Sequence, residues 1–232
     1  MEAETPAKAR KLARRALEKD PDCVDALVLL ADIDCRREHE YIAALQNAVA
    51  AGERSLGARF FKENKGHFWG IIETRPYMRA RLQLAQLLGD EGREQEAIGH
   101  YRALLELNPN DNQGVRDVLL GCYLAVGDLD GAQRLLRQYK NDISAVFAWG
   151  RTLHRFLAGD LQGARRELEA ARKCNRLVEL YLTGQRKLPK SMPEMYALGS
   201  DEEAIISADL LAKAWAKHEE ALHWLTEQVT AR

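Results

Sequence analysis

The feature that most constrains this chain of 232 residues is a spaced trio of residues that recurs along its middle. In each copy a glycine is followed five residues later by alanine and nine residues later by tyrosine or leucine. The second copy begins 35 residues after the first, and the third begins 32 residues after the second. The copies are Gly92, Ala97 and Tyr101; Gly127, Ala132 and Leu136; and Gly159, Ala164 and Leu168. This period is typical of stacked helical hairpins, so the sequence predicts an all-α solenoid of helix-turn-helix repeats.

The chain is expected to begin with a lone helix over residues 5–21. Thr5 can accept a hydrogen bond from the first turn, and Pro6 at the first helical position gives up no needed donor. Small residues then share one helical face, and Pro21 ends the segment; they are Ala9, Ala13 and Ala16. We expect this segment to be the second helix of a hairpin whose first helix is absent, so that the chain either begins with a half-repeat as a cap or is a fragment of a longer protein.

Complete hairpins are expected over residues 24–52, 78–110, 113–143 and 145–176, within one domain covering residues 1–232. Gly52 is interpreted as the end of the first hairpin. Residues 53–77 then form an insertion, because an uninterrupted array would start its next hairpin near residue 58.

The register of the last hairpin needs a choice. A strict count places Arg151 and Arg155 in buried positions, whereas a shift by one residue buries Trp149, Leu153 and Phe156 instead. An unpaired buried arginine is far costlier than a shortened turn, so we adopt the shifted register.

The end of the chain is expected to cap the array. Leu180 begins what could be a further first helix, but Gly184, Pro189 and Pro193 cut it short, so residues 177–199 are assigned to a loop. Ser200 and Glu203 have the spacing of a capping box. Residues 200–232 are therefore predicted to form two capping helices that cover the last apolar face.

The hairpin that starts at Met78 resembles the tetratricopeptide-repeat family. The residues that carry the resemblance are Leu84, Ala85, Leu88, Gly92, Ala97, Tyr101, Leu104 and Pro109. The likeness covers residues 5–52 and 78–174, and it implies a right-handed superhelical solenoid whose first helices line a concave groove. In the next copy Leu120 stands where the family has a small residue, and the neighbouring Gly121 suggests a slip by one position. The run GHFWGIIETRPYMRAR, followed later by NPNDNQG, also resembles bacterial tetratricopeptide-repeat proteins of unassigned function, and that likeness brings no activity with it.

The resemblance also directs attention to the groove. Some relatives hold a peptide's terminal carboxylate with Lys and Asn at the fifth and ninth positions of the first helices. Here these positions hold Val28 and Asp32, Leu82 and Gln86, and Asp117 and Gly121, so that clamp is missing. The groove offers a mixed polar surface, and we predict a non-catalytic scaffold that binds a segment of another protein there. The residues assigned to partner binding are Arg79, Gln86, Arg116 and Asp117, with both arginines as anchors.

The insertion allows two interpretations. In one, residues 60–77 form a loop that lines the groove and contacts the partner through His67, Trp69, Glu73 and Arg75. In the other, the aromatic residues pack into the gap between hairpins, and Arg75 pairs with Glu73 or with nearby Asp or Asn carbonyls. A small-molecule or enzymatic site, with His67 as base and Arg75 holding an anion, is the alternative function.

Several other classes of function find little support. The net charge of −1 gives no general attraction to nucleic acid, and the basic stretch 151–190, with ten Lys and Arg against four Asp and Glu, lacks interleaved aromatics. The NPNDNQG run lacks the acidic twelfth residue of a calcium loop, since Leu119 stands there, and His218 and His223 diverge around their helix. We expect no metal, no cofactor and no enzyme activity. Four cysteines without a C-x-x-C pair, no apolar run after Met1 and no membrane-spanning segment favour a cytoplasmic protein.

Overall fold

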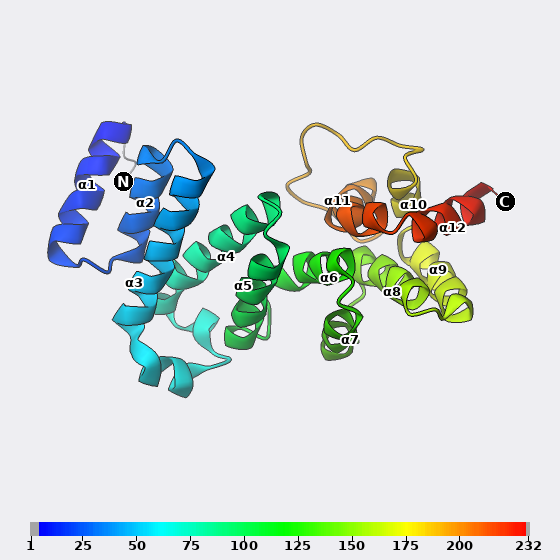
Figure 1. Ribbon diagram of the computed structural model, residues 1–232, viewed down its shortest axis with the longest axis horizontal. Helices are drawn as coiled ribbons and strands as arrows, with labels where there is room; N and C mark the ends of the chain where they lie inside the picture. The colour runs from blue at the N-terminus through cyan, green and yellow to red at the C-terminus, as the bar shows by residue number, and fades with distance from the viewer. Residues whose placement is uncertain (1–4, 231–232) are drawn as a thin grey trace. The chain divides into compact units, whose positions relative to one another are not determined.

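The computed structural model describes residues 5–230, and within that range it contains twelve α-helices, two short 3-10 helices and no strand (Figure 1). Residues 1–4 and 231–232 lie outside the described residues, and with them lies the expectation about the segment after Met1. The helices group into two compact units that divide between Val115 and Arg116, where the sequence predicts one domain. Within residues 5–230 no helix combines the length and the apolar character needed to cross a bilayer.

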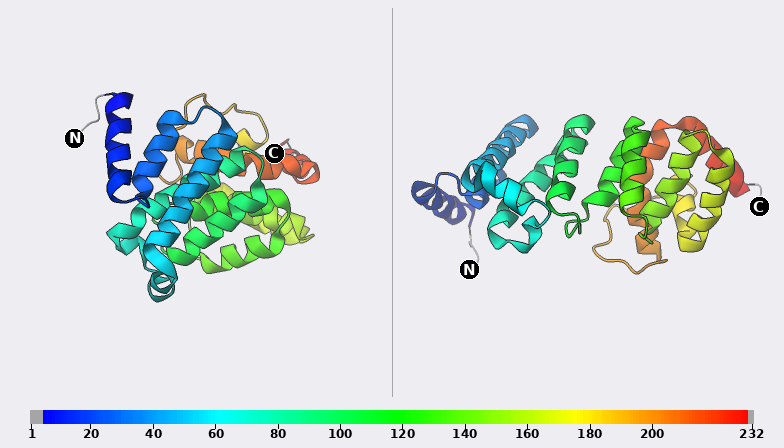
Figure 2. Two further views of the ribbon diagram at one scale, coloured as in Figure 1. Left: turned by 60° about the vertical axis from the view of Figure 1, so that its left-hand side comes forward. Right: turned by 90° about the horizontal axis from the view of Figure 1, so that it is seen from below.

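The first unit contains five α-helices and both 3-10 helices. They are α1 (Pro6–Lys19), α2 (Val24–Asp34), α3 (Glu38–Asn64), η1 (Phe68–Gly70), η2 (Ile72–Thr74), α4 (Arg75–Asp90) and α5 (Glu94–Leu107). Neighbours in sequence pack against each other, and the α4–α5 hairpin can be followed in both views of Figure 2.

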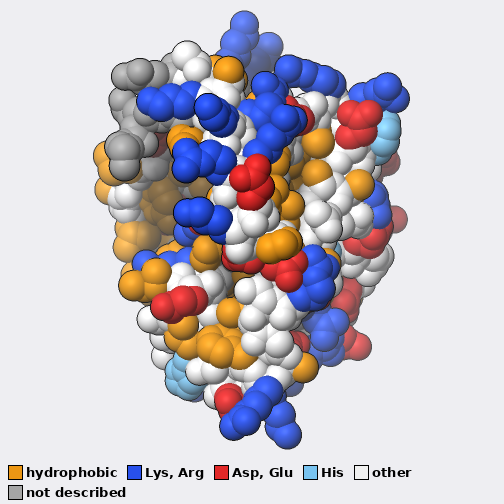
Figure 3. All heavy atoms as spheres, turned by 90° about the vertical axis from the view of Figure 1, so that its left-hand side faces the viewer, with side chains coloured by type: hydrophobic (Ala, Val, Ile, Leu, Met, Phe, Trp, Pro, Cys, Tyr) orange, Lys and Arg blue, Asp and Glu red, His pale blue; other side chains and the backbone are white. Residues whose placement is uncertain are grey.

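Helix α1 begins where the sequence predicts. The Thr5 hydroxyl accepts a hydrogen bond from the Lys8 backbone N–H at 3.3 Å, and Pro6 follows the cap. The helix buries Ala9 and Ala13 against α2. Its opposite face is exposed and rich in Lys and Arg, which gather over the upper part of the surface in Figure 3.

The expectation that a helix ends at Gly52 is wrong. Helix α3 is 27 residues long and ends at Asn64, and it is kinked at Gly57, which has a φ of 75°. Gly52 is buried inside the helix, where an added Cβ would lie 2.9 Å from Cδ2 of Tyr77 and 3.1 Å from Cγ2 of Val24. Gly52 therefore allows three helices to approach closely, and Gly57 supplies the backbone conformation that other residues resist.

Much of the predicted insertion is consequently helical, and its aromatic residues pack together. Phe68 is fully buried, with its ring centroid 4.9 Å from that of Phe61 and 5.8 Å from that of Phe60. The buried Thr74 hydroxyl donates to backbone carbonyls of Phe68 and Ile71, which fixes the turn that leads into α4. The packing interpretation of the aromatic residues is thus the one the structure favours.

The second unit contains the remaining helices. They are α6 (Val115–Val126), α7 (Leu129–Gln138), α8 (Ala145–Leu157), α9 (Leu161–Asn175), α10 (Leu177–Leu182), α11 (Asp201–Lys217) and α12 (Glu219–Thr230). Helix α10 corrects the assignment of all of residues 177–199 to a loop, because six of them are helical. Asp111 caps α6 by accepting a hydrogen bond of 2.7 Å from the Val115 N–H.

The shifted register of α8 is confirmed for Trp149 and Leu153. Trp149 and Leu153 are fully buried, and Phe156 is half-buried. The indole N–H of Trp149 donates to the Asn175 carbonyl at 3.0 Å, so burying the ring leaves no unmet donor. Arg151 reaches the surface and lies 3.5 Å from Glu167.

Glycines set how closely the helices of this unit approach. An added Cβ at Gly150 would lie 2.5 Å from Cδ2 of Leu120. Leu120 stands where the resemblance leads us to expect a small residue, and the small residue at this contact is instead Gly150 of α8. An added Cβ at Gly121 would collide with the backbone carbonyl of Leu210 in α11. The glycine at position 121 is therefore explained by the close approach of α11, and a slip of the repeat by one position is not needed to account for it.

Helix α11 does more than cover the last hairpin. It packs against α10, α12 and α8, and it reaches α6 at Gly121. In Figure 1, α7 lies on one side of α6 and α11 on the other. The predicted cap of Ser200 is present, since its Oγ accepts from the Glu203 N–H at 3.2 Å. The Glu203 carboxylate accepts from the backbone N–H groups of Ala145 (3.2 Å) and Gly199 (2.7 Å), which ties α11 to the start of α8.

Replacing Gly121 with alanine should destabilise the protein by about 1–3 kcal/mol, because the new methyl group meets backbone that cannot rotate away. Gly99 is the matched control: it lies in α5 with nothing within 4 Å of an added Cβ. Gly99→Ala should stabilise by about 0.5–1 kcal/mol through the helix preference of alanine. Chemical denaturation measures both changes, and equal stability of Gly121→Ala and the wild type would contradict the packing of α11 on α6.

Candidate functional site

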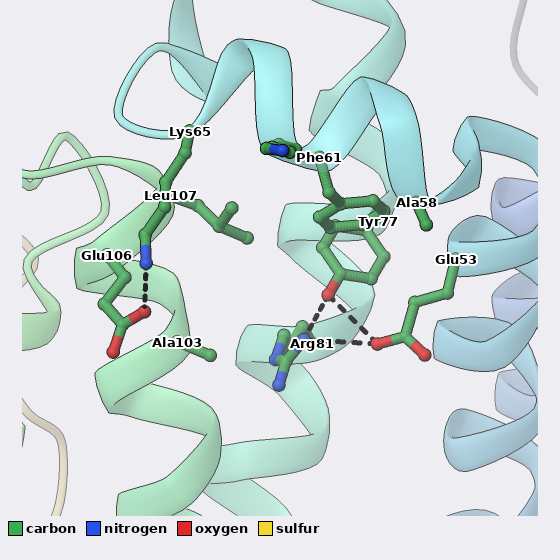
Figure 4. A pocket seen from close by; sticks show the side chains of 10 residues that line it. Glu53, Ala58, Phe61, Lys65, Tyr77, Arg81, Ala103, Glu106 and Leu107 are labelled. Carbon is green, nitrogen blue, oxygen red and sulfur yellow. Dashed lines mark hydrogen bonds and ion pairs between the residues drawn. The ribbon is translucent and has the colours of Figure 1, made fainter.

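A hollow of about 550 Å³ lies in the first unit between α3, α4 and α5 (Figure 4). This volume is within the usual range for pockets that hold ligands or side chains of a partner. Each of the three helices contributes both charged and apolar side chains. The lining residues are Glu53, Ala58, Phe61, Lys62, Lys65, Tyr77, Arg81, Ala103, Glu106 and Leu107.

One wall of the hollow is a connected polar cluster. Arg81 donates to the Tyr77 hydroxyl, and that hydroxyl donates to the Glu53 carboxylate at 3.3 Å. Arg81 is also 3.3 Å from Glu53 and keeps only 17% of its side chain exposed. Burial, with a smaller contribution from Glu53, raises the pKa of Tyr77 to about 12 against the opposing effect of Arg81. The phenol therefore stays protonated and holds this wall in place.

The opposite wall is looser. Lys65 and Glu106 form an ion pair of 2.8 Å, but both side chains are more than half exposed. Such pairs contribute little to stability, so this one can open for an incoming group. Lys62 is exposed and has no carboxylate partner among residues 5–230. The remaining surface is apolar and is formed by Ala58, Phe61, Ala103 and Leu107.

The lining of the hollow combines carboxylate, cationic and apolar side chains. Its carboxylates lie beside cationic groups, and its lining contains no serine, cysteine or histidine that could act as a nucleophile or base. His100 is half-buried, and burial, followed by the charge of Arg81, lowers the pKa of its imidazole. Among residues 5–230 no group of three His, Cys, Asp or Glu residues could hold a metal ion.

The groove residues of the first unit lie away from this hollow. Arg79 forms an ion pair of 2.9 Å with Asp25, and both side chains are more than half exposed. Arg79 and Arg81 are two positions apart on α4, which separates them by about 200° around the helix. Gln86 is exposed and does not line the hollow. The residue that the sequence assigned to the groove, Arg79, and the residues of α4 that line the hollow, Tyr77 and Arg81, thus lie on two different faces of α4.

The groove residues of the second unit are engaged within the chain. The Arg116 guanidinium lies 2.7 Å from Asp142 and over the ring of Tyr139, while Asp117 is 4.0 Å from Arg116. Burial disfavours the charged form of Asp142, but hydrogen bonds from Ser144 and Arg116 outweigh it and lower the pKa of the carboxyl group. From the sequence, Arg116 is assigned to partner binding, and its ion pair with Asp142 is not predicted.

The four insertion residues assigned to partner binding do not line the hollow either. Arg75 donates to the backbone carbonyl of Trp69 at 3.2 Å and lies 5.2 Å from the centre of its ring, so its observed acceptor is neither Glu73 nor an Asp or Asn carbonyl. His67 and Glu73 are exposed. The insertion still contributes to the hollow, but through other residues.

Sequence reasoning missed the lining residues because it ended α3 at Gly52. With α3 continued, residues 58, 61, 62 and 65 have the spacing of a single helical face. Tyr77 and Arg81 likewise have the spacing of helical neighbours on α4. That periodicity was the available signal, and it becomes visible only when residues 53–64 are taken as helix.

No family model matches the chain, and no curated protein matches it. Among solved structures, the crystal structure of BtubC (BKLC) from P. vanneervenii is similar over 83% of this chain and 95% of that chain, with 16% sequence identity and a TM-score of 0.39. A likeness this weak carries no argument about fold or function.

Replacing Arg116 with glutamine should destabilise the protein by about 1–3 kcal/mol at neutral pH, because it removes a charged hydrogen bond to Asp142. Folding lowers the pKa of Asp142, so its contribution is present above the unfolded value of about 3.9 and is lost as the pH falls through the folded value. The difference between variant and wild type should therefore shrink below about pH 4. Denaturation at several pH values measures this.

Arg134→Gln is the matched control, since Arg134 is exposed on α7 and has no carboxylate partner among the described residues. It should leave stability unchanged at every pH. An Arg116→Gln effect that stays constant down to pH 3 would contradict the role given to Asp142.

Proposed function

We propose that the hairpins of this chain are tetratricopeptide-type repeats. The recurring glycine of each trio has a positive φ in the turn between two helices: 74° at Gly92, 73° at Gly127 and 77° at Gly159. The alanine that follows it is fully buried in all three hairpins, at positions 97, 132 and 164. One local geometry that repeats with the sequence period supports repeat units of a single kind.

We further propose that the protein is a non-catalytic scaffold whose first unit binds a segment of another protein. The observation that carries the proposal is the hollow between α3, α4 and α5, with its apolar surface between two charged walls. Interfaces of this composition bury an apolar side chain at the centre and pair charges at the rim.

The charges suggest what the segment contains. Glu53 is already paired with Arg81, and Glu106 with Lys65, whereas Lys62 has no carboxylate partner in the described part of the chain. An aliphatic or aromatic side chain would rest on Phe61 and Leu107, and a neighbouring carboxylate would approach Lys62. The partner would therefore be a short segment with an apolar residue beside an acidic one.

The second unit offers less room for a partner on its first helices. Helix α11 lies against α6 and α8. Burial, with smaller contributions from Asp117, Glu203 and Asp142, raises the pKa of Tyr196 in the loop before α11. Arg116 is bound to Asp142. The proposal consequently moves the main binding surface to the first unit, where Arg79 and Gln86 remain candidates on the other face of α4.

A small-molecule site is the second candidate. The size of the hollow favours it, and so does the contribution of Phe61, Lys62, Lys65 and Tyr77 from the predicted insertion. A small ligand would occupy the same space as the partner's side chain, so the two candidates differ in what binds and not in where it binds.

Filling the hollow tests the proposal. Ala103 lines the hollow and is only half-buried, so Ala103→Trp should occupy the space without unfolding α5. A random peptide library panned against the wild type should enrich sequences with an apolar residue next to an acidic one. Their affinity, measured by calorimetry, should fall at least tenfold in Ala103→Trp, since a buried apolar anchor contributes more than about 1.4 kcal/mol.

Ala170→Trp is the control, because Ala170 is exposed on α9 and lies outside the hollow. It should bind the peptides as the wild type does. Loss of binding in Arg79→Glu together with full binding in Ala103→Trp would move the site to the other face of α4. No enriched peptide at all would contradict peptide binding and favour the small-molecule candidate.

A further inference from the structure

A second hollow, of about 190 Å³, lies in the second unit between α7, α8 and α9. Its lining differs sharply in charge from that of the first, because four side chains are cationic and one is acidic. The lining residues are Gln133, Leu136, Arg137, Lys140, Arg151, His154, Arg155 and Glu167. Helix α7, the turn that follows it and α8 thus bring four cationic side chains to one small space, and α9 contributes the single carboxylate.

The carboxylates near this hollow do not neutralise it. Glu167 pairs with Arg151 at 3.5 Å, and Asp160 pairs with Arg155 at 3.4 Å. Arg137 and Lys140 are exposed and have no carboxylate partner among residues 5–230. Two positive charges at the mouth of the hollow are therefore uncompensated within the described chain.

The inner surface of the hollow is formed by two buried side chains. Leu136 and His154 are both buried, and the His154 Nε2 lies 3.2 Å from the Leu129 carbonyl, to which it donates. Burial, and to a smaller extent Arg155, lowers the pKa of His154, so its ring is neutral at neutral pH. The positive charge of the hollow is thus carried by its Lys and Arg side chains and not by His154.

We propose that this hollow binds a phosphate group. A phosphate carries close to two negative charges at neutral pH, which matches Arg137 and Lys140. Arginine binds phosphate through two parallel hydrogen bonds, and lysine supplies a mobile point charge. The volume is too small for most organic ligands but leaves room for a phosphate group with a few waters.

The lining also argues against nucleic acid as the source of the phosphate. It contains no Phe, Tyr or Trp ring on which a base could stack, and the imidazole of His154 is buried, whereas stacking on aromatic residues is a main feature of single-strand binding. A free phosphate ion and a phosphorylated side chain share the required chemistry. This site lies in the other unit from the proposed partner site, and neither depends on the other.

Isothermal titration with inorganic phosphate at 0.15 M ionic strength tests the site. The expected result is saturable binding with one phosphate per chain, weakened at least tenfold in the double variant Arg137→Gln, Lys140→Gln. Both residues are exposed, so the variant should keep its helical circular dichroism. Gln133→Glu, which adds a negative charge to the lining without removing a cation, should weaken binding to a similar extent.

The charge-matched control is the double variant Arg165→Gln, Arg166→Gln. Both arginines are exposed on α9 outside the hollow, so this variant loses the same net charge and should bind phosphate as the wild type does. A second titration uses N-acetyl-O-phosphoserine amide. Tighter binding of this compound than of inorganic phosphate identifies a phosphorylated side chain as the source, and the reverse order identifies the free ion.

Three results would overturn the proposal. One is the absence of saturable phosphate binding to the wild type at millimolar concentration. Another is equal weakening in both double variants, which would indicate general electrostatic attraction. The last is tight binding of a single-stranded oligonucleotide that is unaffected by Arg137→Gln, Lys140→Gln.

Discussion

The close approach of helices at very small residues is the constraint on which the rest of the structure depends. Gly52 brings α3 against Tyr77 and Val24, Gly150 gives room to Leu120, and Gly121 admits the backbone of α11. At each of these positions a side chain would occupy space that a neighbouring helix already fills. Packing of this density leaves little freedom for the helices to slide, so the surfaces they present are well defined.

The placement of α11 has a consequence for where the protein can bind. Glu203 is almost fully buried, and its carboxylate satisfies backbone donors at the start of α8 and beside Ser200. Asn175 joins the same network by donating to Glu203 at 3.0 Å and accepting from Trp149. Because Glu203, Asn175 and Ala145 are buried, removing α11 from α6 and α8 would leave several polar groups without their hydrogen-bond partners. The proposed binding surface therefore lies in the first unit.

The local features of the fold could be predicted from the sequence, and the long-range ones could not. The cap at Thr5, the turn glycines and the burial of Trp149 follow from rules that act within a few residues. Gly52 has no such local signature, because a glycine that ends a helix and one that admits a neighbouring helix look alike in sequence. The hollow combines residues as distant as Glu53 and Leu107, and Arg116 pairs with Asp142. The sequence alone therefore missed the hollow and took Arg116 for an exposed anchor.

The central claim is that a partner segment occupies the hollow between α3, α4 and α5. The most direct measurement replaces Ala58, an exposed residue of the lining, with the photo-crosslinking residue benzoylphenylalanine and identifies by mass spectrometry where a bound peptide attaches. We predict crosslinks at position 58, with Lys62 left in place to attract the acidic residue of the peptide, and none when the same residue replaces Arg134 on α7. Equal crosslinking at the two positions, or crosslinking at position 134 alone, would contradict it.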